Sequence, residues 1–219
     1  MKSNKFKSAI LLIALFLGVV STSCVKDDNE PIYQSYALFT KFSDGDFRIT
    51  LDNGDVVEQV TNKLNVEKLK DSTRMFIQFH IISKKEGKMN VDILWWNQVT
   101  TKDYVEFSEG ALDSLGNDDI LIRDLWIAHD YLNVTYYYKG LESHKHKVNL
   151  MNITSEDDKN ELNFELRHNA GGDLDYELFS GITSFKIDNL LLPLIKGAKV
   201  KVKFKRSSSK EEVAETVYE

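Results

Sequence analysis

Cysteine and proline are almost absent from this 219-residue chain, which has a single cysteine, Cys24, and two prolines. One cysteine cannot form a disulfide framework within the chain. Only one long apolar run occurs, near the N-terminus, which excludes a protein that crosses a membrane many times with helices. Aromatic residues make up 11% of the chain, which excludes a disordered, collagen-like or low-complexity sequence.

The N-terminus predicts a secretory signal peptide over residues 1–23. Lys2, Lys5 and Lys7 precede an apolar run over 9–20, and small residues then lead to Cys24. This order of basic, apolar and small residues is typical of a signal peptide. The alternative is a transmembrane helix, but the run would span only about 18 Å of a hydrocarbon core of roughly 30 Å.

The end of this segment resembles the lipobox of bacterial lipoproteins. In Ser21-Thr22-Ser23-Cys24, only Ser21 departs from the usual pattern, in which leucine takes that place. The resemblance implies that Cys24 becomes the first residue and carries lipid, which would anchor the protein at the outer membrane. We expect residues 24–34 to form a lipidated tether. Since no other cysteine exists, lipidation would leave no free thiol.

The residues after Cys24 bear on which side of the membrane the protein faces. Val25-Lys26-Asp27-Asp28 resembles the export tag with which some Bacteroidetes lipoproteins reach the cell surface. The resemblance predicts a surface-exposed protein. The alternative is a solvated charged tether on a protein that faces the periplasm.

The mature chain is strongly acidic. Removing residues 1–23 removes three lysines and no acidic residue, which takes the formal net charge from −6 to −9. Nucleic-acid binders usually present a basic face. We therefore expect no nucleic-acid partner, membrane attachment through the lipid, and an unidentified protein or glycan partner.

The body of the chain predicts an all-β fold: a small OB-like barrel followed by an antiparallel β-sandwich. Alternating apolar and polar residues recur between turn signals, of which Asn53-Gly54 is the strongest. A stretch rich in Gly and Asp over 108–119 indicates a boundary, so we place the barrel at 35–110 and the sandwich at 119–219. The predicted strands are 36–42, 47–51, 56–60, 74–82, 89–99, 120–127, 131–138, 146–152, 162–167, 181–187 and 199–205, with an edge strand near Val213 and Val217.

Several segments of the second block resemble the NigD-like lipoproteins of Bacteroidetes. These are Asp124-Leu125-Trp126-Ile127, Tyr131-Leu132-Asn133-Val134, His146-Lys147-Val148-Asn149-Leu150, Phe164-Glu165-Leu166-Arg167-His168-Asn169 and Gly181-Ile182-Thr183-Ser184-Phe185. A departure is the polar His129-Asp130 turn, where glycine is expected. The resemblance implies an OB-like N-terminal domain, a C-terminal sandwich and, from the bacteriocin operon behind the family name, an immunity role. It supplies no catalytic residues.

Histidines are the main candidates for chemistry. On a strand, His144 and His146 would share one face at a spacing that can serve a metal, but no third ligand is evident. His146 has the parity of Val148 and Leu150, so it is expected to border the core. His168 is expected at a strand end that leads into a turn. A hydrolase built on these histidines is an alternative, but no nucleophile elbow, phosphate loop or dinucleotide motif supports it, so we expect no enzyme activity, cofactor or metal.

Two aromatic residues are candidate ligand contacts. By strand parity Trp95 belongs with Val91 and Ile93 in the core, which leaves Trp96 facing out beside polar residues. Tyr137 forms a similar strip with Asn133 and Thr135. Either aromatic residue could contact a sugar or a protein partner, although the adjoining domain could also cover Trp96.

Two triplets resemble the O-glycosylation sequon of Bacteroidetes. They are Asp71-Ser72-Thr73 and Asp113-Ser114-Leu115, both in expected loops, and they make Ser72 and Ser114 candidate acceptors. Together, these features predict a non-enzymatic outer-membrane lipoprotein that binds a partner, with bacteriocin immunity as the specific version. The alternatives are a surface glycan-binding accessory lipoprotein and an envelope hydrolase.

Overall fold

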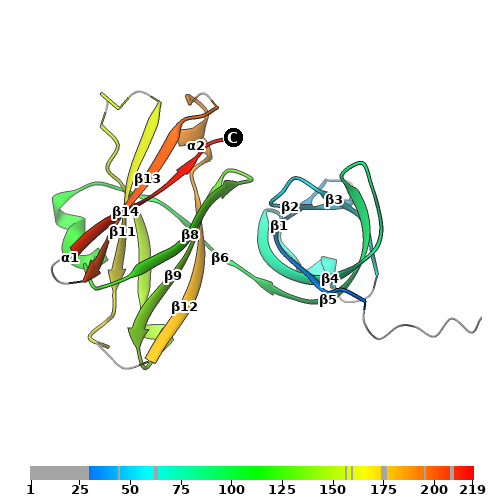
Figure 1. Cartoon of the computed structure of the whole chain (residues 1–219), viewed down its shortest axis with the longest axis horizontal. Coiled ribbons are helices and arrows are strands. Elements are labelled where there is room, and N and C mark those ends of the chain that lie inside the picture. The colour runs from blue at the N-terminus through cyan, green and yellow to red at the C-terminus, as the bar shows by residue number, and fades with distance from the viewer. Residues whose placement is uncertain are drawn as a thin grey trace, which may run out of the picture. The chain divides into compact units, whose positions relative to one another are not determined.

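The computed structural model describes residues 30–219 except 44, 62–63, 156, 159, 174–176, 195 and 208–209, and it leaves the side chains of 59–61 and 144 undescribed. The signal peptide, Cys24 and the Lys26-Asp27-Asp28 segment lie outside these residues. The described chain is all-β, with a barrel and a sandwich, which confirms the predicted fold class (Figure 1). In the described part, neither helix is long and apolar enough to cross a bilayer.

Five strands close into a barrel in the order β1-β2-β3-β5-β4 (Figure 1). The predicted hairpin at Asn53-Gly54 joins β2 to β3, and Gly54 adopts a φ of +87° there, a left-handed conformation that glycine accepts without strain. All five strands were predicted from their alternating pattern. Their bounds are β1 (Tyr33–Lys41), β2 (Phe47–Leu51), β3 (Val56–Thr61), β4 (Thr73–Lys85) and β5 (Lys88–Gln98), with the short 3-10 helix η1 (Val66–Lys68) before β4.

The barrel has its own hydrophobic core. Residues at alternate positions of its strands face inward and exclude water, which is the period of two expected of strands. The buried core residues are Ala37, Phe39, Ile49, Leu51, Val57, Leu69, Met75, Ile77, Phe79, Met89, Val91 and Ile93.

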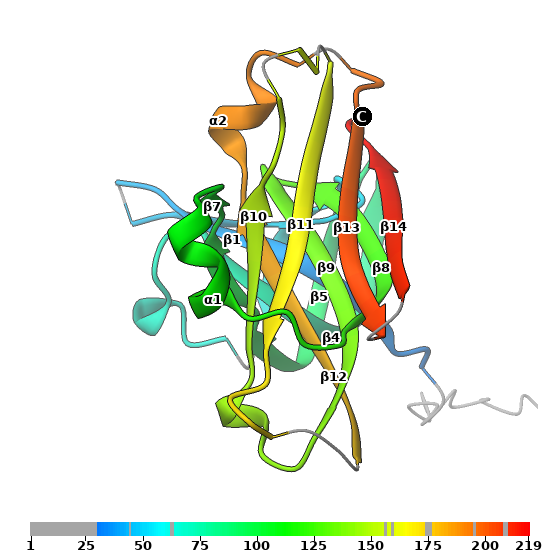
Figure 2. The ribbon, with the colours of Figure 1, turned by 90° about the vertical axis from the view of Figure 1, so that its left-hand side faces the viewer.

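The sandwich consists of two sheets, ordered β14-β13-β11-β10-β7 and β6-β12-β9-β8, and Figure 2 shows the first in front of the second. The strands are β6 (Thr100–Asp103), β7 (Val105–Glu106), β8 (Leu121–Ala128), β9 (Tyr131–Gly140), β10 (Lys147–Asn152), β11 (Glu161–Asn169), β12 (Glu177–Lys186), β13 (Lys199–Ser207) and β14 (Lys210–Val217). The short helices are η2 (Glu109–Ala111), α1 (Leu112–Leu115), η3 (Ser143–Lys145) and α2 (Asp188–Leu191).

Strand pairing in the sandwich is mixed rather than purely antiparallel. β11 pairs with β13 in parallel, and so do β12 with β6 and β10 with β7. The alternating pattern identified most of these strands but carries no information on the direction in which they pair. The antiparallel arrangement holds for β8 with β9, β9 with β12, β10 with β11 and β13 with β14.

The two sheets of the sandwich enclose a second core, separate from that of the barrel. Both sheets contribute apolar side chains to it, as stacked sheets do. Its buried members are Ile120, Leu132, Val134, Tyr136, Tyr138, Val148, Leu150, Leu162, Phe164, Leu166, Phe185, Ile187, Leu191, Val200, Val202 and Phe204.

The barrel passes into the sandwich through a single residue, Val99. β5 ends at Gln98, and β6 begins at Thr100 on the edge of a sandwich sheet. Val99 is buried, and its N–H donates to the Arg74 carbonyl at 2.9 Å. The structure thus differs from the predicted barrel range of 35–110, because residues 100–106 pair with sandwich strands. β6 and β7 are too short to show alternation, so no strand was predicted there.

The His129-Asp130 turn, which departs from the expected glycine, is a tight hairpin between β8 and β9. His129 and Asp130 have φ values of +52° and +66°. Two successive positive φ values characterise the type I′ turn, whose twist matches that of the flanking strands. Asn, Asp and His tolerate positive φ best among residues with side chains. The departure therefore keeps the turn and adds an imidazole to it.

Candidate functional site

The larger described pocket lies at one end of the sandwich and has a volume of about 600 Å³. Its floor is apolar and aromatic, while charged side chains stand around it. The lining residues are Asp118, Asp119, Ile120, Leu121, Tyr137, Tyr138, Lys139, His168, Ala170, Leu178, Lys205, Arg206 and Ser207. A concave surface of this size, with an apolar base and charged groups around it, suits a binding site.

A buried pair of histidines lies beneath this pocket. His146 Nδ1 is 2.9 Å from His168 Nε2, and the two rings stack with an interplanar angle of 16°. Both rings also contact Tyr138. On the far side, His146 Nε2 lies 3.3 Å from the carboxylate of Asp173, which accepts the backbone N–H groups of Leu141 and Glu142. The segment after β9 and the turn after β11 therefore meet at this cluster.

Glycine at position 140 makes the close approach possible. A Cβ atom there would overlap Nε2 of His146. Turn glycines with positive φ at 171 and 172 then bring Asp173 back toward the ring. The prediction that His168 ends a strand and leads into a turn is confirmed, since β11 ends at Asn169.

The hydrogen bonds of His168 define which of its two nitrogens carries hydrogen. His168 Nδ1 lies 2.9 Å from the Asp119 carbonyl oxygen, which can only accept, so this nitrogen donates. Burial lowers the pKa of His168, with the neighbouring His146 adding to the effect, and this favours the neutral ring. Its Nε2 then accepts the hydrogen of His146 Nδ1. Backbone hydrogen bonds from Glu142 and Leu141 lower the pKa of Asp173 and keep it a carboxylate.

This arrangement leaves His168 without a free lone pair for chemistry. A general base needs an acceptor nitrogen within reach of the substrate proton. In His168 that nitrogen accepts from His146, and the ring is only 1% exposed. The two histidines are thus brought together, but they are buried and mutually satisfied, which argues against the hydrolase alternative.

The pH dependence of stability should report this buried pair. The unfolded chain protonates His168 near its ordinary pKa of about 6.5, whereas the folded protein resists the proton. Stability from the neutral ring is thus complete above about pH 6.5 and is lost as the pH falls toward the lowered pKa of the folded state. Urea titrations at pH 7.5 and pH 5.5 should show a larger loss of unfolding free energy for the wild type than for His168→Gln. Equal losses in the two proteins would contradict the assignment.

The carboxylates of the pocket rim are also engaged within the protein. Asp118 accepts the N–H of Ala170 at 2.7 Å, and Asp119 lies 3.5 Å from Lys205. Arg206 pairs with Glu212 at 2.8 Å. At the rim, Asp119, Lys205 and Arg206 are thus paired within the protein, and Asp118 is engaged by the backbone.

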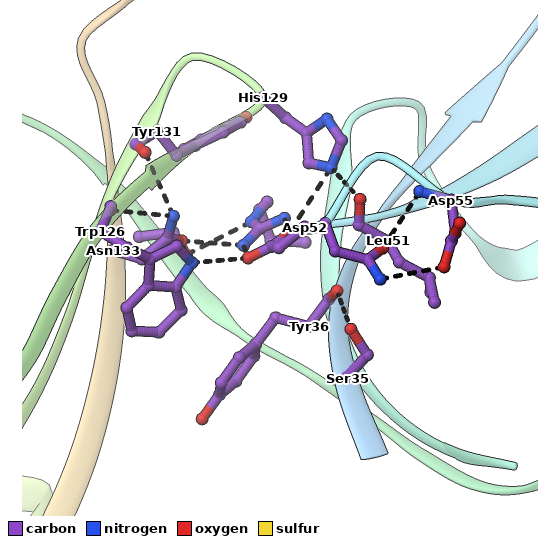
Figure 3. Close-up of polar contacts among 12 residues, drawn as sticks. Ser35, Tyr36, Leu51, Asp52, Asp55, Trp126, His129, Tyr131 and Asn133 are labelled. Carbon is purple, nitrogen blue, oxygen red and sulfur yellow. Dashed lines mark hydrogen bonds and ion pairs between the residues drawn. The ribbon is translucent and has the colours of Figure 1, made fainter. Parts of the chain in front are cut away.

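A second polar cluster joins the barrel to the sandwich (Figure 3). Arg74 on β4 is fully buried and donates two hydrogen bonds, at 2.7 and 2.8 Å, to the carboxylate of Asp52 in the β2–β3 turn. It donates a third, at 2.8 Å, to the side-chain oxygen of Asn133 on β9. Ser184 on β12 donates to the same Asn133 oxygen at 2.6 Å.

The sandwich places two further side chains beside the Asp52 carboxylate. Trp126 Nε1 on β8 donates to Asp52 at 2.7 Å, and His129 Nε2 lies 3.5 Å from it and 3.2 Å from the Leu51 carbonyl (Figure 3). Burial lowers the pKa of His129. We name this set, Asp52, Arg74, Trp126, His129, Asn133 and Ser184, the junction cluster. In this cluster, the buried ion pair of Arg74 and Asp52 is surrounded by further hydrogen-bonding groups, which compensate for the loss of hydration that a buried ion pair suffers.

The structure corrects the predicted roles of the two adjacent tryptophans. Trp95 is 48% exposed, whereas Trp96 is partly buried against the barrel core. The cause is a β-bulge: Gln78 pairs with Trp95 but Phe79 pairs with Ile93, so Leu94 is an extra residue in β5. An extra residue inverts the in-and-out alternation of everything beyond it. Trp95 is therefore the outward residue.

The other predicted site residues fall in several separate places. Tyr137 is half-buried on the wall of the sandwich pocket. Ser72 is exposed in a turn, and Ser114 is exposed within α1 rather than in a loop. His146 follows the helix η3 instead of sharing a strand face with His144, whose side chain is not described. Among the described residues, no cluster of metal-ligating side chains occurs.

The junction cluster was missed by the sequence analysis. Arg74 occupies an outward position of a barrel strand, where a charged residue is ordinarily solvated, and Asp52 belongs to a hairpin turn. Their partners lie 22 to 110 residues away in sequence. The one local signal was the histidine in the β8–β9 turn, where glycine is expected.

These features define an all-β protein with a small barrel joined, through a buried charged cluster, to a pocketed β-sandwich. A model of the NigD-like C-terminal β-sandwich domain matches residues 103–218. The chain belongs to this NigD-like family. The match begins within β6, in agreement with the strand pairing.

Solved structures share the fold over both parts. One is a protein of unknown function from Bacteroides vulgatus, with a TM-score of 0.71 and 24% identity over 86% of this chain and 92% of that one. A protein from Parabacteroides distasonis, provisionally described as toxin-related, has a TM-score of 0.67 and 21% identity over 86% and 93%. A NigD-like immunity protein from Bacteroides caccae has a TM-score of 0.62 and 17% identity over 88% and 100%. No curated protein matches the chain.

Proposed function

We propose that this protein is a non-enzymatic outer-membrane lipoprotein that protects its cell by binding a bacteriocin. The observation that carries the proposal is membership of the NigD-like family, together with a fold shared from barrel to sandwich with a protein described as a NigD-like immunity protein. The lipobox-like segment ending at Cys24 supports anchoring in the envelope. The acidic charge of the mature chain favours a protein or glycan partner over nucleic acid.

The sandwich pocket supports a role in binding rather than catalysis. Its buried imidazole is used within the fold, and its rim carboxylates are paired or hydrogen-bonded. Tyr137 and the 66% exposed Leu178 offer an aromatic and an apolar contact beside exposed charges. Aromatic anchors surrounded by a polar rim are the usual anatomy of a protein interface. We infer that a protruding loop of the toxin enters here.

Deletion of the gene in its host should make the cell sensitive to a bacteriocin from a sibling strain. Wild-type protein should restore protection, whereas Cys24→Ala at equal abundance should not, because lipid chains hold the protein at the membrane. Growth inhibition by culture supernatants of sibling strains is the measurement. Unchanged sensitivity of the deletion strain to every toxin tested would refute the immunity role.

Two tyrosine variants test the pocket within the same assay. Tyr137→Ala should weaken protection, while Tyr33→Ala, which alters a 43% exposed tyrosine on the barrel, should leave it intact. Equal behaviour of the two variants would move the toxin contact away from the pocket.

The side of the membrane is tested by protease treatment of intact cells. The Lys26-Asp27-Asp28 segment supports a surface location, for which loss of the protein from intact cells is expected. Survival in intact cells followed by loss after lysis would place it in the periplasm, with an envelope protein as its partner.

A further inference from the structure

A second, smaller groove of about 190 Å³ lies on the outer wall of the barrel, where β1, β4 and β5 meet strand β12 of the sandwich. It is distinct from the sandwich pocket, since no lining residue is shared. Its walls are Tyr36, Phe76, Trp95, Asn97, Gln98, Val99 and Ile182, all of which are described residues.

One side of this groove is an aromatic row. Tyr36 packs on Phe76 with ring centroids 5.0 Å apart, and Phe76 packs on Trp95 at 6.2 Å. Tyr36 also contacts Trp126 at 5.2 Å, which ties the row to the junction cluster. The packing of Tyr36 on Trp126 fixes one end of the row, whereas Trp95 at the other end is 48% exposed. A rigid aromatic platform with a free indole costs little ordering entropy when a ligand binds.

The polar side chains of the groove are turned to no partner among the described residues. Asn97 and Gln98 are exposed, and their side-chain amides make no hydrogen bond to any described residue; nor does the Tyr36 hydroxyl. Figure 3 shows the Tyr36 ring extending away from Asp52, with its hydroxyl at the far end. Each side-chain amide offers two N–H donors and a carbonyl acceptor, and the phenol hydroxyl can donate or accept a hydrogen bond. A ligand that carries many groups able to donate and accept would match this set.

The groove contains no charged side chain. Every lining residue is aromatic, aliphatic or an uncharged amide. A charged ligand would lose hydration there without a charged partner in the walls of the groove. Arg123 and Asp124, whose charges act on the Tyr36 hydroxyl, pair with each other at 3.3 Å. Its volume lies below the range of drug-sized pockets, which begins at about 300 Å³, so it suits a single ring rather than an extended molecule.

From these four properties we propose that the groove binds a neutral sugar ring, as one unit of an uncharged glycan. The apolar C–H face of the sugar stacks on the indole of Trp95, while its hydroxyls exchange hydrogen bonds with Asn97, Gln98 and Tyr36. This site goes beyond the proposed immunity role, because it uses the barrel and a different class of ligand. It also places the glycan contact at Trp95 rather than at Trp96 or Tyr137.

The test is binding of the full chain, purified in detergent, to an array of neutral gluco-, galacto- and manno-oligosaccharides and of acidic glycans. We expect binding to at least one neutral oligosaccharide, followed by titration calorimetry with that sugar. Trp95→Ala should raise the dissociation constant at least about tenfold, as loss of an aromatic anchor does. Asn97→Ala should weaken binding less, and Trp95→Phe should retain part of it.

Phe107→Ala is the matched control, since Phe107 is a 54% exposed aromatic residue outside the groove. It should bind like the wild type, and equal melting temperatures would show that all variants are folded. Binding to acidic glycans alone, binding that survives Trp95→Ala, or no binding to any neutral glycan would each overturn the proposal. None of these outcomes depends on protection from a toxin, so failure here leaves the immunity role to its own experiment.

Discussion

Replacement of Arg74 by methionine is expected to lower the free energy of unfolding by about 3–5 kcal/mol, the range for breaking a buried ion pair. Arg74 is fully buried and supplies two hydrogen bonds to Asp52, whose side chain is only 12% exposed. Methionine fills much of the volume but leaves the carboxylate without a cation, because Trp126 is a neutral donor and the lowered pKa of His129 keeps that ring neutral at pH 7.5. Urea titration at pH 7.5 measures the loss.

A double-mutant cycle separates the charge from the packing. Adding Asp52→Asn to Arg74→Met removes the stranded charge, so the double variant should be more stable than the sum of the two single variants predicts. Lys88→Met is the control: Lys88 pairs with Glu58 at 2.9 Å, but the two side chains are 62% and 49% exposed. Such a surface pair contributes at most about 1 kcal/mol. A loss in Arg74→Met no greater than that in Lys88→Met would mean that the cluster contributes little to stability.

The sequence predicted the parts of the fold that depend on local patterns. Asn53-Gly54 marked a hairpin because a turn of that type needs positive φ, and the alternating runs marked eleven of the longer strands and the edge strand because one face of each is buried. The short strands β6 and β7 were not predicted, because four and two residues are too few to show a period. The direction of strand pairing was not predictable from the pattern either, because a strand buries the same face beside a parallel neighbour as beside an antiparallel one.

The candidate sites depended on information that lies outside any local window. A single extra residue at Leu94 exchanged the roles of Trp95 and Trp96, and sequence periodicity does not show a bulge. The parity of His146 placed it correctly beside the core, but its partners His168 and Asp173 come from turns that only the tertiary fold brings together. Arg74 is buried because the sandwich covers an outer face of the barrel, which the barrel sequence alone cannot reveal.

The second large effect concerns how the two parts unfold. Phe39 is fully buried in the barrel core and Phe164 is 1% exposed in the sandwich core, so Phe39→Ala and Phe164→Ala should each cost about 3–5 kcal/mol. The two cores share no residue. Among the described residues, they are connected through Val99, the polar contacts of the junction and the packing of Tyr36 on Trp126. These contacts decide whether the loss of packing in one core destabilises the other.

We expect the wild-type junction to couple the parts into one cooperative unit. Val99 leaves no flexible linker between the two parts. The junction cluster joins Asp52 and Arg74 of the barrel to Trp126 and Asn133 of the sandwich by buried hydrogen bonds, and unpairing these groups without access to water is costly. Hydrogen exchange, read separately on barrel and sandwich peptides, should therefore show that Phe39→Ala lowers protection in the sandwich as well as in the barrel. Loss confined to the mutated part would contradict this coupling.

The same measurement in the Arg74→Met background identifies the source of the coupling. Without the guanidinium, Asp52 on the barrel and Asn133 on the sandwich no longer share a donor, and the parts should open independently. Phe39→Ala should then lower protection in the barrel alone, and Phe164→Ala in the sandwich alone. If the effects still spread across both parts, the contacts that do not involve Arg74, namely those of Trp126 with Asp52 and Tyr36 and the passage through Val99, would suffice to couple them. Separation would instead assign to a buried arginine the role of making one folding unit from two independent cores.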